Sequence, residues 1–350
     1  MSVRLGEVQG MSHNLHFFRF AAAILVIMSH SFALSSGNFE GEWFYHYSGG
    51  QVTMGAFAVG VFFLYSGFLI TRGFKKAPTG KEFFVVRCAR IFPLLFMTVS
   101  LSVIILGPLM TQVSLTEYFK DINTYKYFLN SIFVLQHDLP GVFKDNIYTA
   151  TVNGALWTLP VEFLCYVICF GGHKLKILVK GRLWMTIPFV ILGSLGTCYI
   201  AAKVEMPMLT TVLFPVLCFC VGVLFAIYRD CIIMNYCWFI VPLVLFGILG
   251  YLGYLKLGFV LFFSYSLIYI AFGSRELFPH MWKSGNWSYA MYLCGFPIQQ
   301  AVVAINGGRM NPYINMIITI PIIIFIAILL YETIEKRVSE NLNKLKAERD

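Results

Sequence analysis

The chain has 350 residues, of which 58% are hydrophobic and only 12% are charged, and its mean hydropathy is +0.74. This composition excludes a soluble globular domain and predicts an all-α, polytopic integral membrane protein, because the apolar runs are too long and too weakly alternating for a transmembrane barrel. A net charge of +9 suggests nucleic-acid binding in a soluble protein, but here membrane topology explains most of it, so we expect no nucleic-acid partner.

Apolar runs long enough to cross a bilayer recur along the chain without a fixed repeat or a low-complexity linker. We expect the first of them to insert and stay, because no clear signal with a small-residue cleavage site precedes it. One domain is expected over residues 1–350, with a charged, helix-prone tail from about residue 332. About ten transmembrane helices are predicted, at 15–35, 53–71, 90–110, 155–172, 184–202, 208–228, 232–252, 257–273, 287–304 and 312–331.

An even number of spans puts both termini on one side of the membrane. If that side is the cytoplasm, 20 of the 26 Lys and Arg residues lie inside, so the positive-inside rule favours the N-in, C-in orientation and a charged cytoplasmic tail. The longest outer segment, residues 111–151, contains an amphipathic stretch, YKYFLNSIFVLQH, which is expected to lie along the outer surface as a short helix. The cysteines lie mostly inside spans, so we interpret them as buried apolar side chains and expect no disulfide framework and no metal site.

The first predicted span carries an arginine at its start and a histidine inside an otherwise apolar run. Arg19 and His30 are eleven residues apart, which brings them within roughly 20° of the same helix face and separates them by about 16 Å along the axis. With Arg19 at the cytoplasmic headgroups, His30 lies near the middle of a hydrocarbon layer about 30 Å thick. His30 is therefore a candidate base for a hydroxyl, and the alternative is a packing histidine that hydrogen-bonds a neighbouring span.

Glu162, in NGALWTLPVEFLCYV, is the only carboxylate well inside an apolar run. Its span descends from the outside, which puts Glu162 roughly 10 Å deep and at a depth comparable to that of His30. A carboxylate that accepts the imidazole N–H fixes its tautomer and stabilises the imidazolium. The alternative is a structural partner of a buried Arg, Ser or Tyr.

Arginines gather at the cytoplasmic entrance of the third span. Arg87 and Arg90, in VVRCARIFP, are three residues apart on one helical face, and Arg72 precedes them. Together with Arg19 they form a candidate clamp for an anionic nucleotide from the cytoplasm, because Arg binds phosphate bidentately. The alternative for each is an interfacial arginine that topology and anionic membrane lipids require.

Other polar residues have weaker signals. Ser66, in VFFLYSGFLI, lies on the cytoplasmic half of the second span beside Gly67 and is a further candidate for binding the nucleotide with the arginines. No G-x-S-x-G elbow makes it a nucleophile, and small residues there usually pack helices. Aromatic residues near span ends have the alternative of an interfacial belt. The residues predicted to line a substrate cavity are Asn153, Trp157, Tyr289 and Tyr292.

Taken together, these segments resemble the acyltransferase 3 family of integral membrane acyltransferases, which modify sugars of bacterial surface glycans. The segments that carry the resemblance run in family order from residue 14 to 336: NLHFFRFAAAILVIMSHSF, VFFLYSGFLI, RCARIFP, NGALWTLPVEF, SYAMYLCGFPI and YETIEK. The resemblance implies a multi-pass protein of the bacterial plasma (inner) membrane. It implies cytoplasmic acyl-CoA, most commonly acetyl-CoA, as the donor, and a hydroxyl of a polysaccharide or its lipid-linked precursor on the outer face as the acceptor.

The resemblance also implies roles for single residues. Arg19, Arg87 and Arg90 match the arginines thought to hold the coenzyme, His30 matches the catalytic histidine, and Glu162 matches the carboxylate of the Trp-to-Glu segment. In this reading His30 deprotonates a sugar hydroxyl or relays the acyl group covalently, and both routes stay open.

The chain departs from the family pattern at two positions. Gly295 stands where the family often has a second histidine, and His16 stands where it commonly has an aspartate three residues before the arginine. The first departure removes a proton-transfer group, and the second leaves open how the start of the first span is held. We see no appended extracytoplasmic esterase-like domain, so transfer is expected to finish within the membrane unit.

Two other readings remain. A transporter or flippase for a lipid-linked sugar would use the same buried charges as a substrate path, although no inverted repeat and no matched pair of Gly/Pro-broken spans supports it. A catalytically inactive binding relative is weakened by the presence of Arg19 and His30. The acyl group, the acceptor sugar and the oligomeric state are left open.

Overall fold

The structure is a computed structural model that describes residues 3–7, 13–74, 79–203, 209–274, 277 and 287–347. Helices dominate the described residues, and the single two-stranded sheet found among them pairs β1 (Val3–Arg4) with β2 (Ile233–Met234) in antiparallel register. The prediction of a helical protein from apolar composition is therefore confirmed.

The chain forms two compact units, each built from three separate stretches. Unit 1 contains Met1–Ala22, Trp43–Gly80 and Thr158–Gly285, and unit 2 contains Ala23–Glu42, Lys81–Trp157 and Asn286–Asp350. Helix α1 (His13–Ser36) contributes its first part to unit 1 and its second part to unit 2. The expectation of one domain over residues 1–350 stays a prediction.

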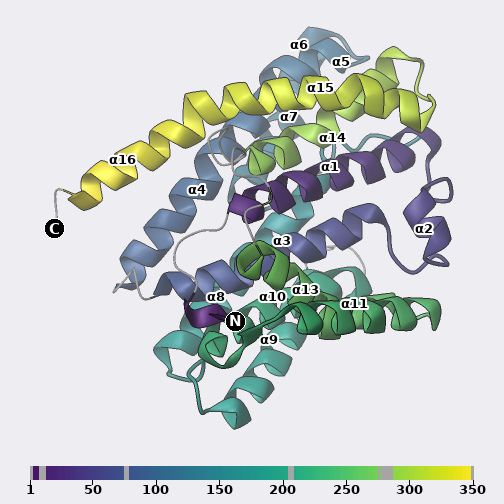
Figure 1. Cartoon of the computed structure of the whole chain (residues 1–350). Helices are drawn as coiled ribbons and strands as arrows, with labels where there is room; N and C mark the ends of the chain where they lie inside the picture. Colours follow the sequence, from purple (N-terminus) through teal and green to yellow (C-terminus); the bar gives the residue numbers. More distant parts are fainter. Residues whose placement is uncertain are drawn as a thin grey trace. The chain divides into compact units, whose positions relative to one another are not determined.

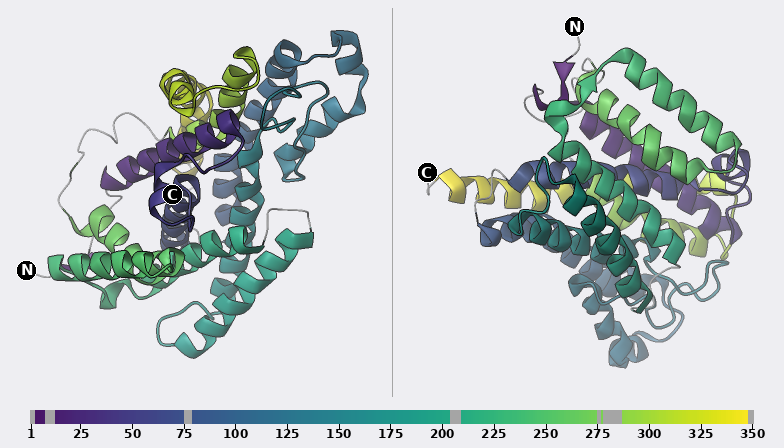
Figure 2. Two further views of the ribbon diagram at one scale, coloured as in Figure 1. Left: turned by 90° about the vertical axis from the view of Figure 1, so that its right-hand side faces the viewer. Right: turned by 90° about the horizontal axis from the view of Figure 1, so that it is seen from below.

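Unit 1 is a set of mostly apolar helices. One helical run, Leu255–Gly273, includes α12 and α13, and α11 lies beside it (Figure 2). The helices after α1 are α2 (Trp43–Tyr47), α3 (Met54–Gly73), α8 (Thr158–Lys174), α9 (Leu183–Lys203), α10 (Leu209–Ile227), α11 (Tyr236–Tyr251), α12 (Leu255–Gly258) and α13 (Ser264–Ile268).

Helices α3 and α10 approach each other through a pair of glycines. A Cβ added at Gly67 would lie 2.1 Å from the carbonyl oxygen of Phe219, and one added at Gly222 would lie 2.1 Å from the carbonyl oxygen of Leu64. Only glycine allows two helix backbones to come this close, which is a common device in membrane helix pairs. This contact also fixes the position of Ser66, the residue before Gly67.

Unit 2 is organised by the second part of α1 and by α14 and α15, and the last two lie side by side (Figure 1). Helix α15 begins after Asn311, whose Oδ1 accepts a hydrogen bond from the Tyr313 N–H (2.9 Å), and Pro312 fills the first position, where no N–H is needed. The helices of this unit are α4 (Gly80–Leu101), α5 (Gly107–Met110), α6 (Leu115–Lys120), α7 (Ile122–Lys126), α14 (Ser288–Ile305), α15 (Pro312–Leu330) and α16 (Lys336–Ala347).

Two predictions about local structure can be compared with unit 2. A π-helical turn over Tyr331–Glu335 joins α15 to α16, so the expected helical continuation into the charged tail is confirmed. In the outer segment (residues 111–151), α7 and a 3-10 helix over Tyr127–Ile132 confirm a short helix for the first part of the amphipathic stretch. The helix ends at Phe133, whose left-handed φ of 67° turns the chain.

By length and composition, six helical stretches among the described residues can cross a membrane: Asn14–Ser36, Met54–Gly73, Gly80–Met110, Gly154–Lys174, Leu255–Gly273 and Pro312–Leu342. The other four predicted spans are helical as well, over α9, α10, α11 and α14. The membrane character is therefore supported, whereas ten crossings and the N-in, C-in orientation stay predictions.

Candidate active site

His30 lies in the part of α1 that belongs to unit 2, and it is partly buried. Its ring meets the ring of Phe296 on α14 edge to face, with 5.2 Å between centroids, and Phe296 meets Tyr148 in the same way at 5.9 Å. In the part of the chain that the structure describes, the imidazole of His30 makes no hydrogen bond. The alternative of a packing histidine that is hydrogen-bonded to a neighbouring span therefore gains no support, and contact of the ring nitrogens with a substrate stays a prediction.

A buried polar network holds the helical turn that carries His30. Gln299 of α14 donates from Nε2 to the carbonyl oxygen of Ile27 (2.8 Å) and to Ser31 Oγ (2.6 Å), and Ser31 Oγ donates to Asn315 Oδ1 on α15 (3.0 Å). The three polar side chains are fully buried. Because Ile27 and Ser31 flank His30, the network fixes this part of α1 against α14 and α15.

Gly295 lies where α14 packs closely on α1. A Cβ at this position would lie 3.2 Å from Ile27 Cγ1, which is tighter than an ordinary contact. A histidine here, as the family pattern often has, requires Ile27 to move. Close packing of two helices therefore accounts for this departure from the pattern.

The start of α1 is held in unit 1 by Asn14 and not by an aspartate. The buried Asn14 side chain donates to the carbonyl oxygen of Ile270 (3.0 Å) and to Ser274 Oγ (3.1 Å), and it accepts from the backbone N–H of Leu277 (2.8 Å). This answers the question left open by His16 in the sequence.

Glu162 of α8 forms a hydrogen-bonded triangle with Ser66 of α3 and Tyr166, all in unit 1. Ser66 Oγ donates to Glu162 Oε1 at 2.6 Å, Tyr166 OH donates to the same oxygen, and Ser66 Oγ lies 2.9 Å from Tyr166 OH. Ser66 and Glu162, predicted for separate roles, are thus brought together. The contact corresponds to the alternative of a Ser or Tyr partner for Glu162. Because His30 belongs to the other unit, its matched depth with Glu162 stays a prediction.

Tyr166 is a site residue that the sequence analysis missed. It is buried, and it lies four residues after Glu162 on the same face of α8. That spacing was the available signal, but a tyrosine in an aromatic-rich apolar helix is not distinctive.

Arg72 lies near the end of α3, beside two aromatic rings that contact each other. Its guanidinium carbon is 5.5 Å from the centre of the Phe68 ring and 6.0 Å from that of Phe272. Cation–π contacts of this kind hold the side chain while leaving N–H groups for an anion.

The other three predicted arginines are partly exposed and helical. Arg87 and Arg90 lie on α4, which confirms that they share a helical face, and Arg87 is 5.7 Å from the centre of the Phe83 ring. Arg19 lies on α1. Their contact with a coenzyme stays a prediction.

Two of the predicted substrate residues hold the chain before α8 against α14. Asn153 Nδ2 donates to the carbonyl oxygen of Leu293 (2.8 Å), and its Oδ1 accepts from the Ala155 N–H (3.1 Å). Tyr292 OH donates to the carbonyl oxygen of Ala155 (2.6 Å). These bonds lie beside the apolar core around Phe296, so both residues shape the surroundings of His30.

The remaining two predicted substrate residues are Tyr289 and Trp157. Tyr289 OH donates to the carbonyl oxygen of Ile91 on α4 (3.0 Å), so it joins α14 to the helix that carries Arg87 and Arg90. Trp157 is partly buried at the end of a 3-10 turn, Gly154–Trp157. Contact of either residue with a substrate stays a prediction.

Glu42 is a buried carboxylate that the sequence analysis missed as well. It is fully buried in unit 2 and accepts a hydrogen bond from Ser29 Oγ at 3.2 Å. Glu42 lies in the polar loop after α1, so hydropathy carried no signal for it. Since Ser29 precedes His30, this bond also supports the turn that carries the imidazole.

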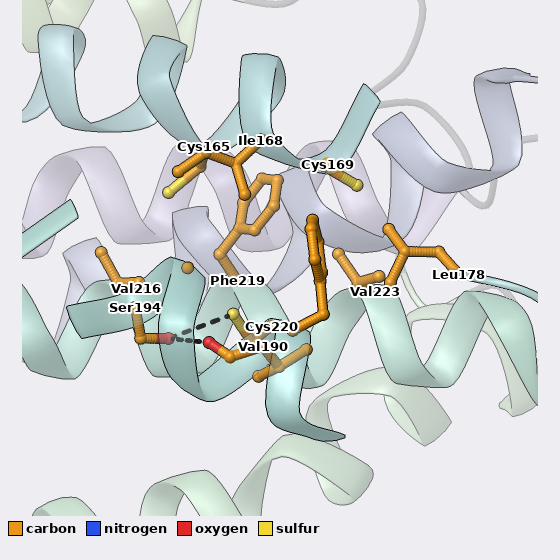
Figure 3. Close-up of a pocket in the computed structure, with 12 residues that line it drawn as sticks. Cys165, Ile168, Cys169, Leu178, Val190, Ser194, Val216, Phe219, Cys220 and Val223 are labelled. Carbon is orange, nitrogen blue, oxygen red and sulfur yellow. Dashed lines mark hydrogen bonds between the residues drawn. The ribbon is translucent and has the colours of Figure 1, made fainter. Parts of the chain in front are cut away.

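Unit 1 contains an apolar pocket between α8, α9 and α10 (Figure 3). Cys165 and Cys169 line it as buried free thiols, which agrees with the predicted apolar role of the cysteines. Ser194 Oγ donates to the carbonyl oxygen of Val190 (2.8 Å) and lies 3.6 Å from Cys220 Sγ. The described lining includes no histidine and no carboxylate, so this pocket suits a hydrocarbon chain and not proton transfer.

Comparison with known proteins adds an independent line of argument. A family model described as an acyltransferase domain matches residues 12–334. The chain is 30% identical over 332 residues to the O-acetyl transferase of Shigella phage Sf6, which covers 91% of this chain and 93% of the phage protein. It is 29% identical over 164 residues to nodulation protein 10 of Rhizobium leguminosarum bv. viciae, which covers 45% of this chain and 43% of that protein. No solved structure matches the chain.

Proposed function

We infer, since the chain belongs to the acyltransferase 3 family of membrane acyltransferases, that it moves an acetyl group from cytoplasmic acetyl-CoA to a hydroxyl of a cell-surface or capsular polysaccharide or of its lipid-linked precursor. The likeness to a phage O-acetyl transferase over nearly the whole length of both chains supports the acetyl group. The observation that carries the chemistry is His30, whose imidazole is packed against Phe296 and makes no hydrogen bond within the described residues.

The reaction needs one base and one acyl donor. His30 accepts the proton of the sugar hydroxyl as the oxygen attacks the thioester carbonyl, the new C–O bond forms, the C–S bond breaks, and the imidazolium returns the proton to the coenzyme thiolate. In the covalent variant, an imidazole nitrogen attacks the thioester carbonyl and the C–S bond breaks, which releases the coenzyme thiolate. The sugar oxygen then attacks the acetyl carbon, the N–C bond breaks, and the hydroxyl proton goes to the thiolate. Arg19, Arg72, Arg87 and Arg90 are the proposed partners of the coenzyme phosphates, because guanidinium groups bind phosphate bidentately.

The proposed setting is the bacterial plasma membrane, with ten crossings and both termini in the cytoplasm. The split of 20 Lys and Arg inside to six outside supports this orientation. It puts Arg19 at the donor side and the outer segment at the acceptor side.

Replacement of Glu162 by glutamine is expected to lower kcat by about ten- to a hundredfold, because hydrogen bonds to a charged group are worth about 1.5–3 kcal/mol and each 1.36 kcal/mol is a factor of ten. The loss should be smaller than that of His30→Ala, because Glu162 holds the hydroxyl groups of Ser66 and Tyr166 and is not proposed to accept the substrate proton. Tyr166→Phe, which removes only one donor to the same carboxylate, should have a milder effect, and Glu40→Gln, on an exposed loop carboxylate, should have none. Steady-state transfer kinetics measure this, and equal losses for Glu162→Gln and His30→Ala would refute the positioning role.

A sided transfer assay tests the proposed function. The protein is reconstituted in sealed liposomes with labelled acetyl-CoA presented only at the face that carries the tail, and candidate glycans are presented only at the opposite face. We expect label on the glycan, and longer-chain acyl-CoA donors in parallel define the acyl group. If transfer requires donor and acceptor at the same face, the proposed route across the membrane is wrong.

The second candidate is a transporter or flippase for a lipid-linked sugar. A substrate path would also use polar groups within helices, such as the partly buried triangle of Ser66, Glu162 and Tyr166. Movement of the glycan across the liposome membrane without covalent change would favour this function.

A further inference from the structure

A cavity of about 170 Å³ lies in unit 2, between the outer segment and the turn that follows α14. An apolar cavity of about 150 Å³ is known to admit benzene, so this volume is sufficient for one six-membered ring. Its wall combines the side chains of Gln112, Asp145 and Asn146 with the buried ring of Phe143. A wall with both polar and apolar parts matches a ring that carries hydroxyl groups on an apolar carbon skeleton.

The polar groups of the cavity are held in place by bonds within unit 2. Gln112 Nε2 donates to Asp145 Oδ2 at 2.5 Å, and the buried Asn146 donates from Nδ2 to Gln300 Oε1 at 2.8 Å. The backbone at Gly308 packs closely on that of Asp145, because a Cβ at Gly308 (φ +85°) would lie 2.2 Å from the carbonyl oxygen of Asp145. Carboxylate and amide oxygens in fixed positions accept hydrogen bonds from alcohols.

The charged side chains among the lining residues indicate which class of ligand the cavity suits. Asp145 is the ionisable side chain among the lining residues, and the described lining includes no Lys, Arg or His. A carboxylate in a lining without Lys or Arg disfavours phosphate and other anions, which bind where Arg and Lys gather. The wall therefore suits a neutral polyol.

The cavity is connected to the surroundings of His30 through α14. Ala304 lines the cavity, and it lies eight residues after Phe296, or about 12 Å along the helix. Gln300, between them, donates to the carbonyl oxygens of Tyr148 (2.8 Å) and Thr151 (2.9 Å). A sugar ring in the cavity is therefore too far from the imidazole of His30 to react there. It is close enough to be part of the same oligosaccharide as a reacting sugar at His30.

We propose that this cavity is a subsite for a sugar ring of the acceptor that neighbours the ring being acylated. The proposal rests on the proposed function, and it adds which part of the chain holds the acceptor. Binding of a remote sugar would position the reacting hydroxyl, so that longer acceptors are favoured over single sugars.

The test is direct binding to the full-length protein in lipid nanodiscs, by saturation-transfer NMR with methyl glycosides of glucose, galactose, rhamnose and N-acetylglucosamine. Wild-type protein is expected to bind at least one of them. Asp145→Asn should raise the Kd of that glycoside about tenfold, because it replaces a charged hydrogen-bond acceptor by a neutral one. Ala304→Leu should abolish binding, because the larger side chain fills the cavity. Asp138→Asn, on an exposed residue of the outer segment away from the cavity, is the matched control and should bind as wild type does.

Melting temperatures of the variants show whether they are folded, and Asp145→Asn is expected to fold because the side chain is exposed and asparagine can still accept from Gln112. The inference is overturned if wild-type protein binds none of the glycosides, or if both cavity variants bind them as wild type does. Acetyl transfer is measured on the same samples. Glycoside binding without transfer by wild-type protein would refute the proposed function alone, whereas transfer with unchanged binding in both variants would refute the subsite alone.

Discussion

Replacement of His30 by alanine is expected to lower acetyl transfer by about 10²- to 10⁴-fold, the usual contribution of a general base. The reason is that the imidazole is proposed to take the proton of the attacking hydroxyl, and no other histidine or carboxylate is proposed for that step. If His30 acts instead as a covalent relay, the loss is at least as large. Transfer of label from acetyl-CoA to glycan in liposomes measures the effect.

The controls for this variant separate chemistry from structure. His137→Ala removes an exposed histidine from the outer segment and should leave transfer unchanged. Because the buried network of Ser31, Gln299 and Asn315 remains in His30→Ala, its melting temperature and its Kd for acetyl-CoA should stay near the wild-type values. Undiminished transfer in a folded His30→Ala protein would show that the catalytic assignment is wrong.

Replacement of Gly67 by alanine is expected to destabilise unit 1 by about 3 kcal/mol, at the upper end of the range for overpacking. The added Cβ would meet the carbonyl oxygen of Phe219 at 2.1 Å, and because this obstacle is backbone, α3 and α10 have to move apart. Transfer should also fall, since Ser66 and its bond to Glu162 move with Gly67. Thermal unfolding in detergent, followed by size-exclusion chromatography, measures the loss.

The matched control for Gly67 is Gly247→Ala. Gly247 is also helical, on α11, and an added Cβ there meets no atom within 4 Å. Alanine is the better helix former, so this variant should be as stable as wild type or slightly more stable. Equal melting temperatures for the two variants would contradict the close packing of α3 on α10.

The helices could be predicted from the sequence, because a long apolar run in lipid has to satisfy its backbone hydrogen bonds internally. The particular residues that meet where two helices pack could not be predicted in this way. The sequence predicts that small residues such as Gly67 pack against another helix, but it does not identify Phe219 as the partner, because the path of α10 cannot be inferred from the residues near Gly67. The division of the chain into two units also has no local signal in the sequence, because each unit is built from three separate stretches of the chain.

The candidate site was predicted in part. His30 and Glu162 stood out because an ionisable group inside an apolar run is costly, whereas Glu42 is surrounded by polar loop residues and gave no such contrast. The sequence leaves two interpretations of Glu162 open, a bond to the imidazole of His30 or a structural partner among Arg, Ser and Tyr, and the structure shows bonds to Ser66 and Tyr166. The hydrogen bond from Asn153 to the backbone of α14 could not be predicted, because Asn153 and Leu293 are 140 residues apart in the sequence.

The central claim is that His30 enables transfer of an acetyl group to a surface glycan. Mass spectrometry of surface glycans tests it most directly, in cells that lack the gene and carry either the wild-type chain or His30→Ala at equal membrane levels. We expect glycan repeats heavier by one acetyl group with the wild-type chain and unmodified repeats with His30→Ala. Identical glycan masses in the two strains, whether both acetylated or both unmodified, would contradict it.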